Sequence, residues 1–149
     1  MEKINIKIVN KSKNPLPTYE TKLSAGMDLR ASLENEEPIT INPGERKLIK
    51  TDLYMEIPEG YEAQIRPRSG LAWKNGVTVL NAPGTIDSDF RGNVGIILIN
   101  HSSIPFTVNQ GDRIAQMVIC KHEKAKLENV LFLTETKRGH GGFGSTNIK

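Results

Sequence analysis

Residues 81–92 read NAPGTIDSDFRG and separate two apolar runs, residues 77–80 before them and residues 94–99 after them. Pro83 fixes its own φ angle and Gly84 tolerates a positive φ angle, so this pair marks a turn. Apolar runs on both sides of a turn-rich segment predict two strands joined by a hairpin-like arm. The second run is almost entirely apolar, and we therefore expect a strand that is buried on both faces.

Asp87 is the candidate acid of this stretch. It follows the apolar Ile86 and precedes the polar pair Ser88-Asp89 and the aromatic Phe90. A carboxylate at the mouth of a sheet can accept a proton from water as a general base. Polar residues in this place are also typical of an ordinary turn, and the stretch taken alone favours the turn.

Composition limits the class of protein. The length of 149 residues fits one domain with its own core. The net charge is +3 and the pI is about 9.0. The pI indicates anionic partners weakly, but no run of five basic residues is present, so we expect no nucleic-acid-binding arm. The single Cys120 excludes an internal disulfide and suits a reducing compartment, so we expect a cytoplasmic protein. No apolar run approaches membrane-spanning length, and we expect no membrane contact.

Short apolar segments with strand-like alternation recur along the chain, and turn signals such as NPGE and NQGD separate them. The expected strands are residues 3–9, 25–31, 39–41, 53–57, 61–65, 77–80, 94–99, 106–108, 114–119 and 130–133. Residues 69–75 are the best helix candidate, with Ser69 as N-cap and Gly76 as the stop. Many short strands at this spacing predict an all-β sandwich, barrel or jelly roll.

Other segments offer groups that bind anions. Arg68 and Ser69 stand at the start of the expected helix, where they suit a phosphate or an ordinary solvated helix end. Residues 138–146 combine an arginine, glycines, hydroxyls and the isolated Phe143, which suit a nucleotide or a disordered tail. Asp28 lies within an expected strand, where it would pair with an arginine or hold metal-bound water. The scattered histidines argue against a zinc site, and the absence of G-x-S-x-G argues against an elbow serine. There is no G-x-x-x-x-G-K and hence no P-loop.

Taken in order, five segments resemble the five motifs of the trimeric dUTP nucleotidohydrolases, the dUTPases. They are residues 25–31, 66–70, 81–92, 111–117 and 138–146, and they extend over nearly the whole chain. The resemblance implies a jelly-roll-like β subunit, with one short helix, in a homotrimer that has three shared active sites. Residues 1–137 would form this domain, and residues 138–149 would be a flexible glycine-rich tail that closes over a neighbour's site. It also implies Mg²⁺-dependent hydrolysis of dUTP to dUMP and pyrophosphate, which removes dUTP and supplies dUMP for thymidylate synthesis.

The resemblance assigns roles to individual residues. Asp87 matches the acid that activates the water attacking the α-phosphorus, and Asp28 matches an indirect, water-mediated magnesium contact. The implied substrate-binding set is Arg68, Ser69, Gly70, Asn81, Gly84, Thr85, Ile86, Asp87, Phe90, Gln116, Arg138, Phe143, Gly144, Ser145 and Thr146. Within this set, Asn81 and the backbone of residues 84–87 would read uracil, and Phe143 would stack on the base.

Phe90 departs from the family pattern, in which this position is commonly Tyr. Phe keeps the ring face that packs against deoxyribose and loses the hydroxyl, so discrimination against UTP would rest on the shape of the ring alone.

Three alternatives compete with the dUTPase interpretation. A related dCTP deaminase, or a bifunctional deaminase, needs a glutamate in the strand after the central motif, and residues 94–99 contain no acid. A non-enzymatic relative could lose Asp87 or the tail, and both are present. A nucleic-acid-binding barrel would need stacking aromatics, which make up only 5% of residues.

Overall fold

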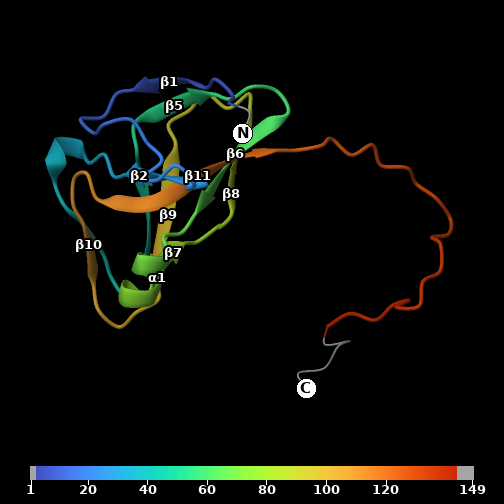
Figure 1. Ribbon diagram of the computed structural model, residues 1–149. Helices are drawn as coiled ribbons and strands as arrows, with labels where there is room; N and C mark the ends of the chain where they lie inside the picture. Colours follow the sequence, from blue (N-terminus) through green and yellow to red (C-terminus); the bar gives the residue numbers. More distant parts are fainter. Residues whose placement is uncertain (1–2, 144–149) are drawn as a thin grey trace.

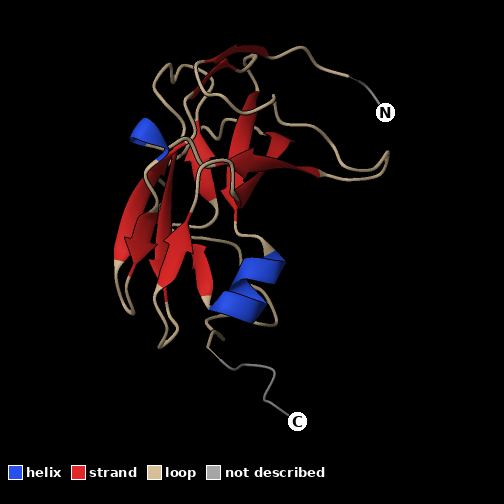
Figure 2. Ribbon diagram, turned by 90° about the vertical axis from the view of Figure 1, so that its left-hand side faces the viewer, coloured by secondary structure: helices blue, strands red, loops and turns tan. Residues whose placement is uncertain are grey.

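Short β-strands form the body of the protein over residues 3–143, the part of the chain that this computed structural model describes. The strands are β1 (Lys7–Asn10), β2 (Gly26–Arg30), β3 (Ile39–Ile41), β4 (Arg46–Lys50), β5 (Leu53–Glu56), β6 (Tyr61–Arg66), β7 (Val77–Val79), β8 (Gly84–Ile86), β9 (Gly95–Asn100), β10 (Phe106–Val108) and β11 (Arg113–Lys121). The connections hold one α-helix, α1 (Ser69–Asn75), and one 3-10 turn, η1 (Glu34–Glu36), within these residues. The prediction of an all-β subunit with one short helix is confirmed (Figures 1 and 2).

Four antiparallel sheets surround one core. The largest has the strand order β2-β11-β6-β8, the second has the order β4-β9-β7, and the pairs β1-β5 and β10-β3 complete the body. Successive side chains of a strand point to opposite faces, so each alternating segment sends every second residue inward. On β9, Ile96 and Leu98 are fully buried, whereas Ile97 and Ile99 on the other face are only half-buried.

The expectation that residues 94–99 are buried on both faces is not met within one chain. The outer face of β9 packs beside β4, where Leu48 stands opposite Ile97 and is 63% exposed. The inner face alone belongs to the core. The apolar residues on the outer face are therefore left for contacts that a single chain does not provide.

The predicted strand at residues 130–133 is wrong. After β11 ends at Lys121, the chain runs to residue 143 without regular structure, and Figure 1 shows it leaving the body. Leu131, Phe132 and Leu133 are 91%, 87% and 87% exposed. An apolar segment becomes a strand only where a second strand offers backbone partners, and no described part of this chain lies alongside it. The apolar pattern is thus present without the pairing that would make it a strand.

The N-cap of helix α1 lies one residue earlier than predicted. Arg68 is the N-cap, without a side-chain capping bond, and Ser69 is the first helical residue. The predicted stop at Gly76 is confirmed, because its φ of 63° is left-handed and its N–H donates to the carbonyls of Ala72 and Leu71. The Ser69 hydroxyl therefore does not cap the helix, contrary to the prediction.

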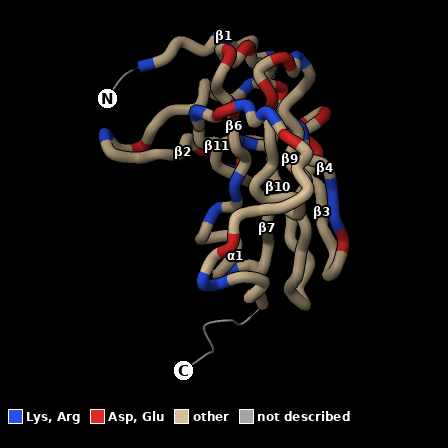
Figure 3. Tube along the Cα trace, turned by 90° about the vertical axis from the view of Figure 1, so that its right-hand side faces the viewer, with Lys and Arg blue, Asp and Glu red and all other residues tan. Residues whose placement is uncertain are grey.

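Charged residues of both signs are distributed over the trace, rather than gathered in one block (Figure 3). None of the helices in the described part of the chain is long and apolar enough to cross a membrane.

Candidate active site

Asp28 organises a cluster of charges at one end of the largest sheet. It lies on β2, where Oδ1 accepts a hydrogen bond from Arg68 Nε at 3.0 Å and Oδ2 accepts one from Arg113 Nη1 at 3.2 Å. Arg68 also donates to the backbone carbonyl of Arg113 at 3.0 Å. The Asp28 side chain is only 20% exposed, so these pairs are less screened by water than pairs on the surface. Of the two roles that the sequence left open for Asp28, the structure shows pairing with arginine.

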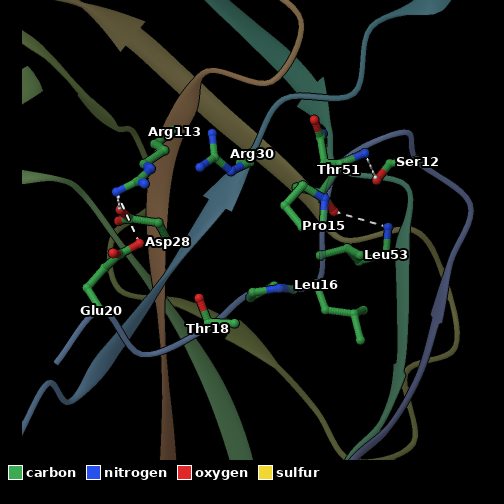
Figure 4. Close-up of a pocket in the computed structure, with 12 residues that line it drawn as sticks. Ser12, Pro15, Leu16, Thr18, Glu20, Asp28, Arg30, Thr51, Leu53 and Arg113 are labelled. Atoms are coloured by element: carbon green, nitrogen blue, oxygen red, sulfur yellow. Dashed lines mark hydrogen bonds and ion pairs between the residues drawn. The ribbon is translucent and has the colours of Figure 1, made fainter. Parts of the chain in front are cut away.

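Glu20 adds a second acid to this cluster. Its carboxylate lies 3.2 Å from Arg113 Nη1, and Figure 4 shows Glu20 and Asp28 both pointing at that guanidinium. A pocket of about 90 Å³ adjoins the cluster and is lined by residues of the segment 12–20, by β2 and by Thr51 and Leu53. Ligand pockets usually occupy about 300–1,000 Å³, so this pocket is too small for a nucleotide.

Gln116 joins this cluster to the start of α1. In the sheet register Gln116 faces Asp28 of β2 on one side and Arg66 of β6 on the other. Its side-chain Nε2 donates to the carbonyl of Pro67 at 2.9 Å, immediately before the N-cap. A Cβ on Gly26 would lie 2.4 Å from Gln116 Oε1, so a larger residue at position 26 would displace the Gln116 side-chain amide.

Five predicted site residues are therefore neighbours in one chain. They are Asp28, Arg68, Ser69, Gly70 and Gln116, of which Ser69 and Gly70 are exposed on the first turn of α1. Arg113, Glu20 and Gly26 belong to the same place, although the sequence analysis did not assign them to the site. The G-D-R sequence at 111–113 and the A-G-M-D sequence at 25–28 were the available signals.

The predicted uracil-reading arm forms the edge of the same sheet. Gly84, Thr85 and Ile86 make up β8 and pair with Ile65, Gln64 and Ala63 of β6. A Cβ on Gly84 would lie 3.3 Å from Ile65 Cβ and 3.4 Å from the amide nitrogen of Asn81, and the Ala82–Pro83 peptide bond is cis. Asn81 and Gly84 are thus brought together as expected.

A tight turn follows β8 and carries Asp87 and Phe90. Phe90 N–H donates to the carbonyl of Asp87 at 3.2 Å. The Arg91 guanidinium donates to the carbonyls of Ser88 at 2.7 Å and of Phe90 at 3.0 Å. The Asp87 side chain is exposed, and Phe90 is 42% exposed. This turn presents an accessible carboxylate and an accessible ring on a braced backbone.

The carboxylate of Glu56 lies close enough to this turn for the charge of Arg91 to affect its pKa. The hydrogen bond from Lys7, at 2.9 Å, lowers the pKa of Glu56 first, and the charge of Arg91 makes a smaller contribution in the same direction. Both side chains of the Lys7–Glu56 pair are exposed, so the pair contributes little to stability.

The register of β6 and β8 separates Asp87 from Ser69. Ile86 faces Ala63, and the antiparallel register carries Asp87 one residue further toward the start of β6. Ser69 follows the opposite end, after Arg66. A strand rises about 3.3 Å per residue, so Ala63 and Arg66 alone are about 10 Å apart. One chain therefore assembles the arginine cluster and the Asp87 turn at different places.

The tail residues are also apart from the rest of the predicted site. Arg138 Nε donates to the carbonyl of Gly141 at 2.8 Å, within the tail itself. Phe143 is fully exposed, and Figure 1 shows this segment running away from the body. Gly144, Ser145 and Thr146 lie outside the described residues.

Comparison with known proteins places the chain among its relatives. The family model dUTPase matches residues 12–147. A Rhizobium rhizogenes protein named deoxyuridine 5′-triphosphate nucleotidohydrolase is 54% identical over 133 residues, which cover 89% of this chain and 85% of that protein. A Finegoldia magna protein of the same name is 54% identical over 143 residues, which cover 96% and 99%.

The fold is similar to solved phage enzymes. A point mutant of the dUTPase of Staphylococcus bacteriophage 80alpha, solved with dUpNHpp, matches with a TM-score of 0.81 and 26% identity over 97% of this chain and 99% of that chain. A point mutant of the dUTPase from phage phi11 of S. aureus, described with a structural Mg(II) ion, matches with a TM-score of 0.76 and 25% identity over 87% and 98%. The resemblance predicted from the five motifs is confirmed, and the chain belongs to the dUTPase family.

Proposed function

We propose that this protein is a dUTP diphosphatase that hydrolyses dUTP to dUMP and pyrophosphate in the cytoplasm. The observation that carries the proposal is the cluster in which Asp28 aligns Arg68 and Arg113 beside Ser69, in a chain of the dUTPase family. A guanidinium fixed by a carboxylate loses little freedom when it binds a phosphate. In a cell this activity would remove dUTP and supply dUMP for thymidylate synthesis.

The triphosphate would bind at the arginine cluster. Arg68 keeps part of its guanidinium accessible, and Ser69 and Gly70 contribute an exposed hydroxyl and an exposed backbone N–H beside it. Gln116, held by the Pro67 carbonyl, places its amide at the same end of the sheet. Both oxygens of Asp28 already bind arginines, so Asp28 does not compete with the phosphates for these donors.

Uracil would be read by β8. In the four-stranded sheet β8 pairs only with β6, so its other backbone edge is open among the described residues. Unpaired N–H and C=O groups on a strand edge match the alternating donors and acceptors of a pyrimidine. The Asn81 amide beside Gly84 adds a side-chain donor and acceptor. The tight Pro83-Gly84 turn beside this edge should leave little room for a methyl group on the base.

Asp87 would act as the general base. Its carboxylate takes a proton from water while the water oxygen attacks the α-phosphorus and the bond to the β-phosphate bridging oxygen breaks. The products are dUMP and pyrophosphate. Arg68 and Arg138 would neutralise charge on the phosphate oxygens, and Phe143 would cover the base and exclude water.

Mg²⁺ fits this site as an ion that the triphosphate carries. Within residues 3–143 no group of three or more His, Cys, Asp or Glu residues is placed to hold a metal, and magnesium commonly keeps waters and substrate phosphates as ligands. Because Asp28 is engaged by two arginines, its contact with the ion would run through water. Bound there, Mg²⁺ would neutralise charge that develops on the phosphate oxygens.

The working unit would be a homotrimer. A site that needs both Asp87 and Ser69 is incomplete in one chain, because Asp87 lies beside the start of β6 and Ser69 follows the end of β6. Cyclic symmetry lets each chain complete the site of a neighbour. The outer face of β9 and Leu48 offer an apolar contact surface for it.

The exposed arm after β11 also fits such an assembly. It carries five exposed apolar side chains, namely Leu127, Val130, Leu131, Phe132 and Leu133. Burying one such side chain is worth about 1.5–3 kcal/mol, so the arm gains free energy on a neighbouring copy. From there the tail of residues 138–149 would reach a neighbour's site.

The direct test of this function is release of pyrophosphate from dUTP, dTTP, dCTP and UTP, assayed in parallel with Mg²⁺. We expect turnover of dUTP and rejection of dTTP, because a methyl group would clash at the Gly84 arm. Turnover of dTTP comparable to that of dUTP would contradict the proposal. Release of ammonia from dCTP would support the deaminase alternative, and no turnover of any nucleotide would support the non-enzymatic one.

A further inference from the structure

The ring of Phe90 lies directly over Gly92. A Cβ on Gly92 would be 2.5 Å from Phe90 Cζ and 2.9 Å from Cε2. Carbon atoms in favourable contact are about 3.5–4.0 Å apart, so a methyl group there would displace the ring by about 1 Å or more. Gly92 does not have a positive φ angle, unlike Gly76 or Gly111. Its backbone therefore accepts an alanine, and the ring alone requires a glycine.

The backbone on both sides of this contact is fixed. Arg91 bonds the carbonyls of Ser88 and Phe90. Asn93 Nδ2 donates to Asp52 Oδ1 at 2.6 Å, and Asn93 Oδ1 accepts from the Asp52 N–H at 3.1 Å. With the chain held before and after Gly92, the side-chain torsions of Phe90 decide where the ring points.

A phenylalanine ring has no hydroxyl through which a hydrogen bond could orient it. Phe90 is also 42% exposed, so few neighbours restrict it. The contact with Gly92 is thus a principal constraint on the ring. Because the contact involves the far end of the side chain, the ring, rather than the backbone, would yield to an added methyl group.

We propose that Gly92 is a specificity-determining position: it seats the Phe90 ring in the orientation that separates dUTP from UTP. This inference rests on the proposed function and on the role that the family resemblance implies for Phe90, whose ring would pack against deoxyribose and leave no room for a 2′-hydroxyl. Moving the ring would remove packing from dUTP and, at the same time, the barrier to UTP. Gly92 acts through Phe90 and is a positioning residue.

The test is Gly92→Ala, with kcat/KM measured for dUTP and for UTP. We expect the dUTP/UTP ratio to fall about tenfold or more, which is the usual scale for losing a steric pocket contact. The molecular mass in solution and the melting temperature should stay unchanged. Ser88→Ala is the matched control, because it alters the same turn and keeps the Ser88 carbonyl that binds Arg91, and it should keep the wild-type ratio.

A double-mutant cycle separates this role from a general loosening of the turn. Phe90→Ala should lower the ratio by itself, and Gly92→Ala should add nothing in that background. The inference would be overturned if Gly92→Ala kept the wild-type dUTP/UTP ratio. It would also be overturned if Gly92→Ala lowered this ratio equally in the wild-type and Phe90→Ala backgrounds. The relative affinities for dUMP and UMP, measured by calorimetry, should change in the same way. If the wild-type protein failed to turn over dUTP, the proposed function would fail, and the dUMP/UMP affinity ratio would still decide this inference.

Discussion

Asp87→Asn should lower the turnover of dUTP by about 10²–10⁴-fold, the usual contribution of a general base. The amide has nearly the same shape as the carboxylate but does not take a proton from water at neutral pH. Asp87 is exposed on its turn, so the change leaves no buried group unpaired and the fold should be unaffected. The measurement is kcat at saturating dUTP, together with the affinity for a non-hydrolysable dUTP analogue, which should stay close to that of the wild type.

Asp89→Asn is the matched control for this variant. It makes the same chemical change two residues further along the same turn, and its side chain is also exposed. We expect near-wild-type turnover. If Asp87→Asn also kept near-wild-type turnover, Asp87 would be a turn residue without a role in the chemistry.

Deleting residues 138–149 should also cause a large loss of activity. Over residues 138–143 the hydrogen bonds are local, from Arg138 to Gly141 and from Gly139 to Thr136, and the side chains are exposed. The melting temperature should therefore be almost unchanged. Loss of a base stack worth about 1–3 kcal/mol and of a charged hydrogen bond worth about 1.5–3 kcal/mol should lower kcat/KM by about 10²–10⁴-fold.

Two point variants separate the contribution of the base contact to kcat/KM from that of the phosphate contact. Phe143→Ala should lose the stacking contribution, and Arg138→Ala should lose the phosphate contact. Both should keep the melting temperature of the full chain. Full activity in the truncated protein would show that residues 138–149 do not take part in the reaction.

Local patterns in the sequence were sufficient for most of the fold. The alternation in residues 25–31 and 61–65 predicted β2 and β6, because the period of two depends only on which face meets the core. Gly76 predicted the end of α1 for an equally local reason, its tolerance of a left-handed φ angle. The five ordered motifs likewise predicted the family from short stretches of sequence.

The remaining features depend on contacts between distant residues. The apolar pattern of residues 130–133 predicts a strand, but pairing decides whether one forms, and the described part of this chain provides no partner. Arg113 joins Asp28 across 85 residues of sequence through the β2–β11 register, which no local pattern reveals. The separation of Asp87 from Ser69 likewise follows from the antiparallel register of β6 and β8.

In the proposed homotrimer, one chain supplies Ser69 and another supplies Asp87 to each active site. Two variants test it, Asp87→Asn and Ser69→Ala. Ser69 is exposed and has no capping bond, so its replacement should leave the fold intact. Its lost phosphate contact should lower kcat by about 10²–10³-fold.

The decisive measurement is dUTPase activity of mixed oligomers, obtained by co-expressing the two variants with different tags and purifying through both. Light scattering should give the mass of a trimer. A site has both wild-type groups when its Ser69 comes from the Asp87→Asn chain and its Asp87 comes from the Ser69→Ala chain. In a cyclic mixed trimer, about one site in three meets this condition. We therefore predict that the mixture regains activity far above that of either variant alone. Mixed trimers no more active than the average of the two variants, or a monomer mass with full wild-type activity, would contradict the shared site.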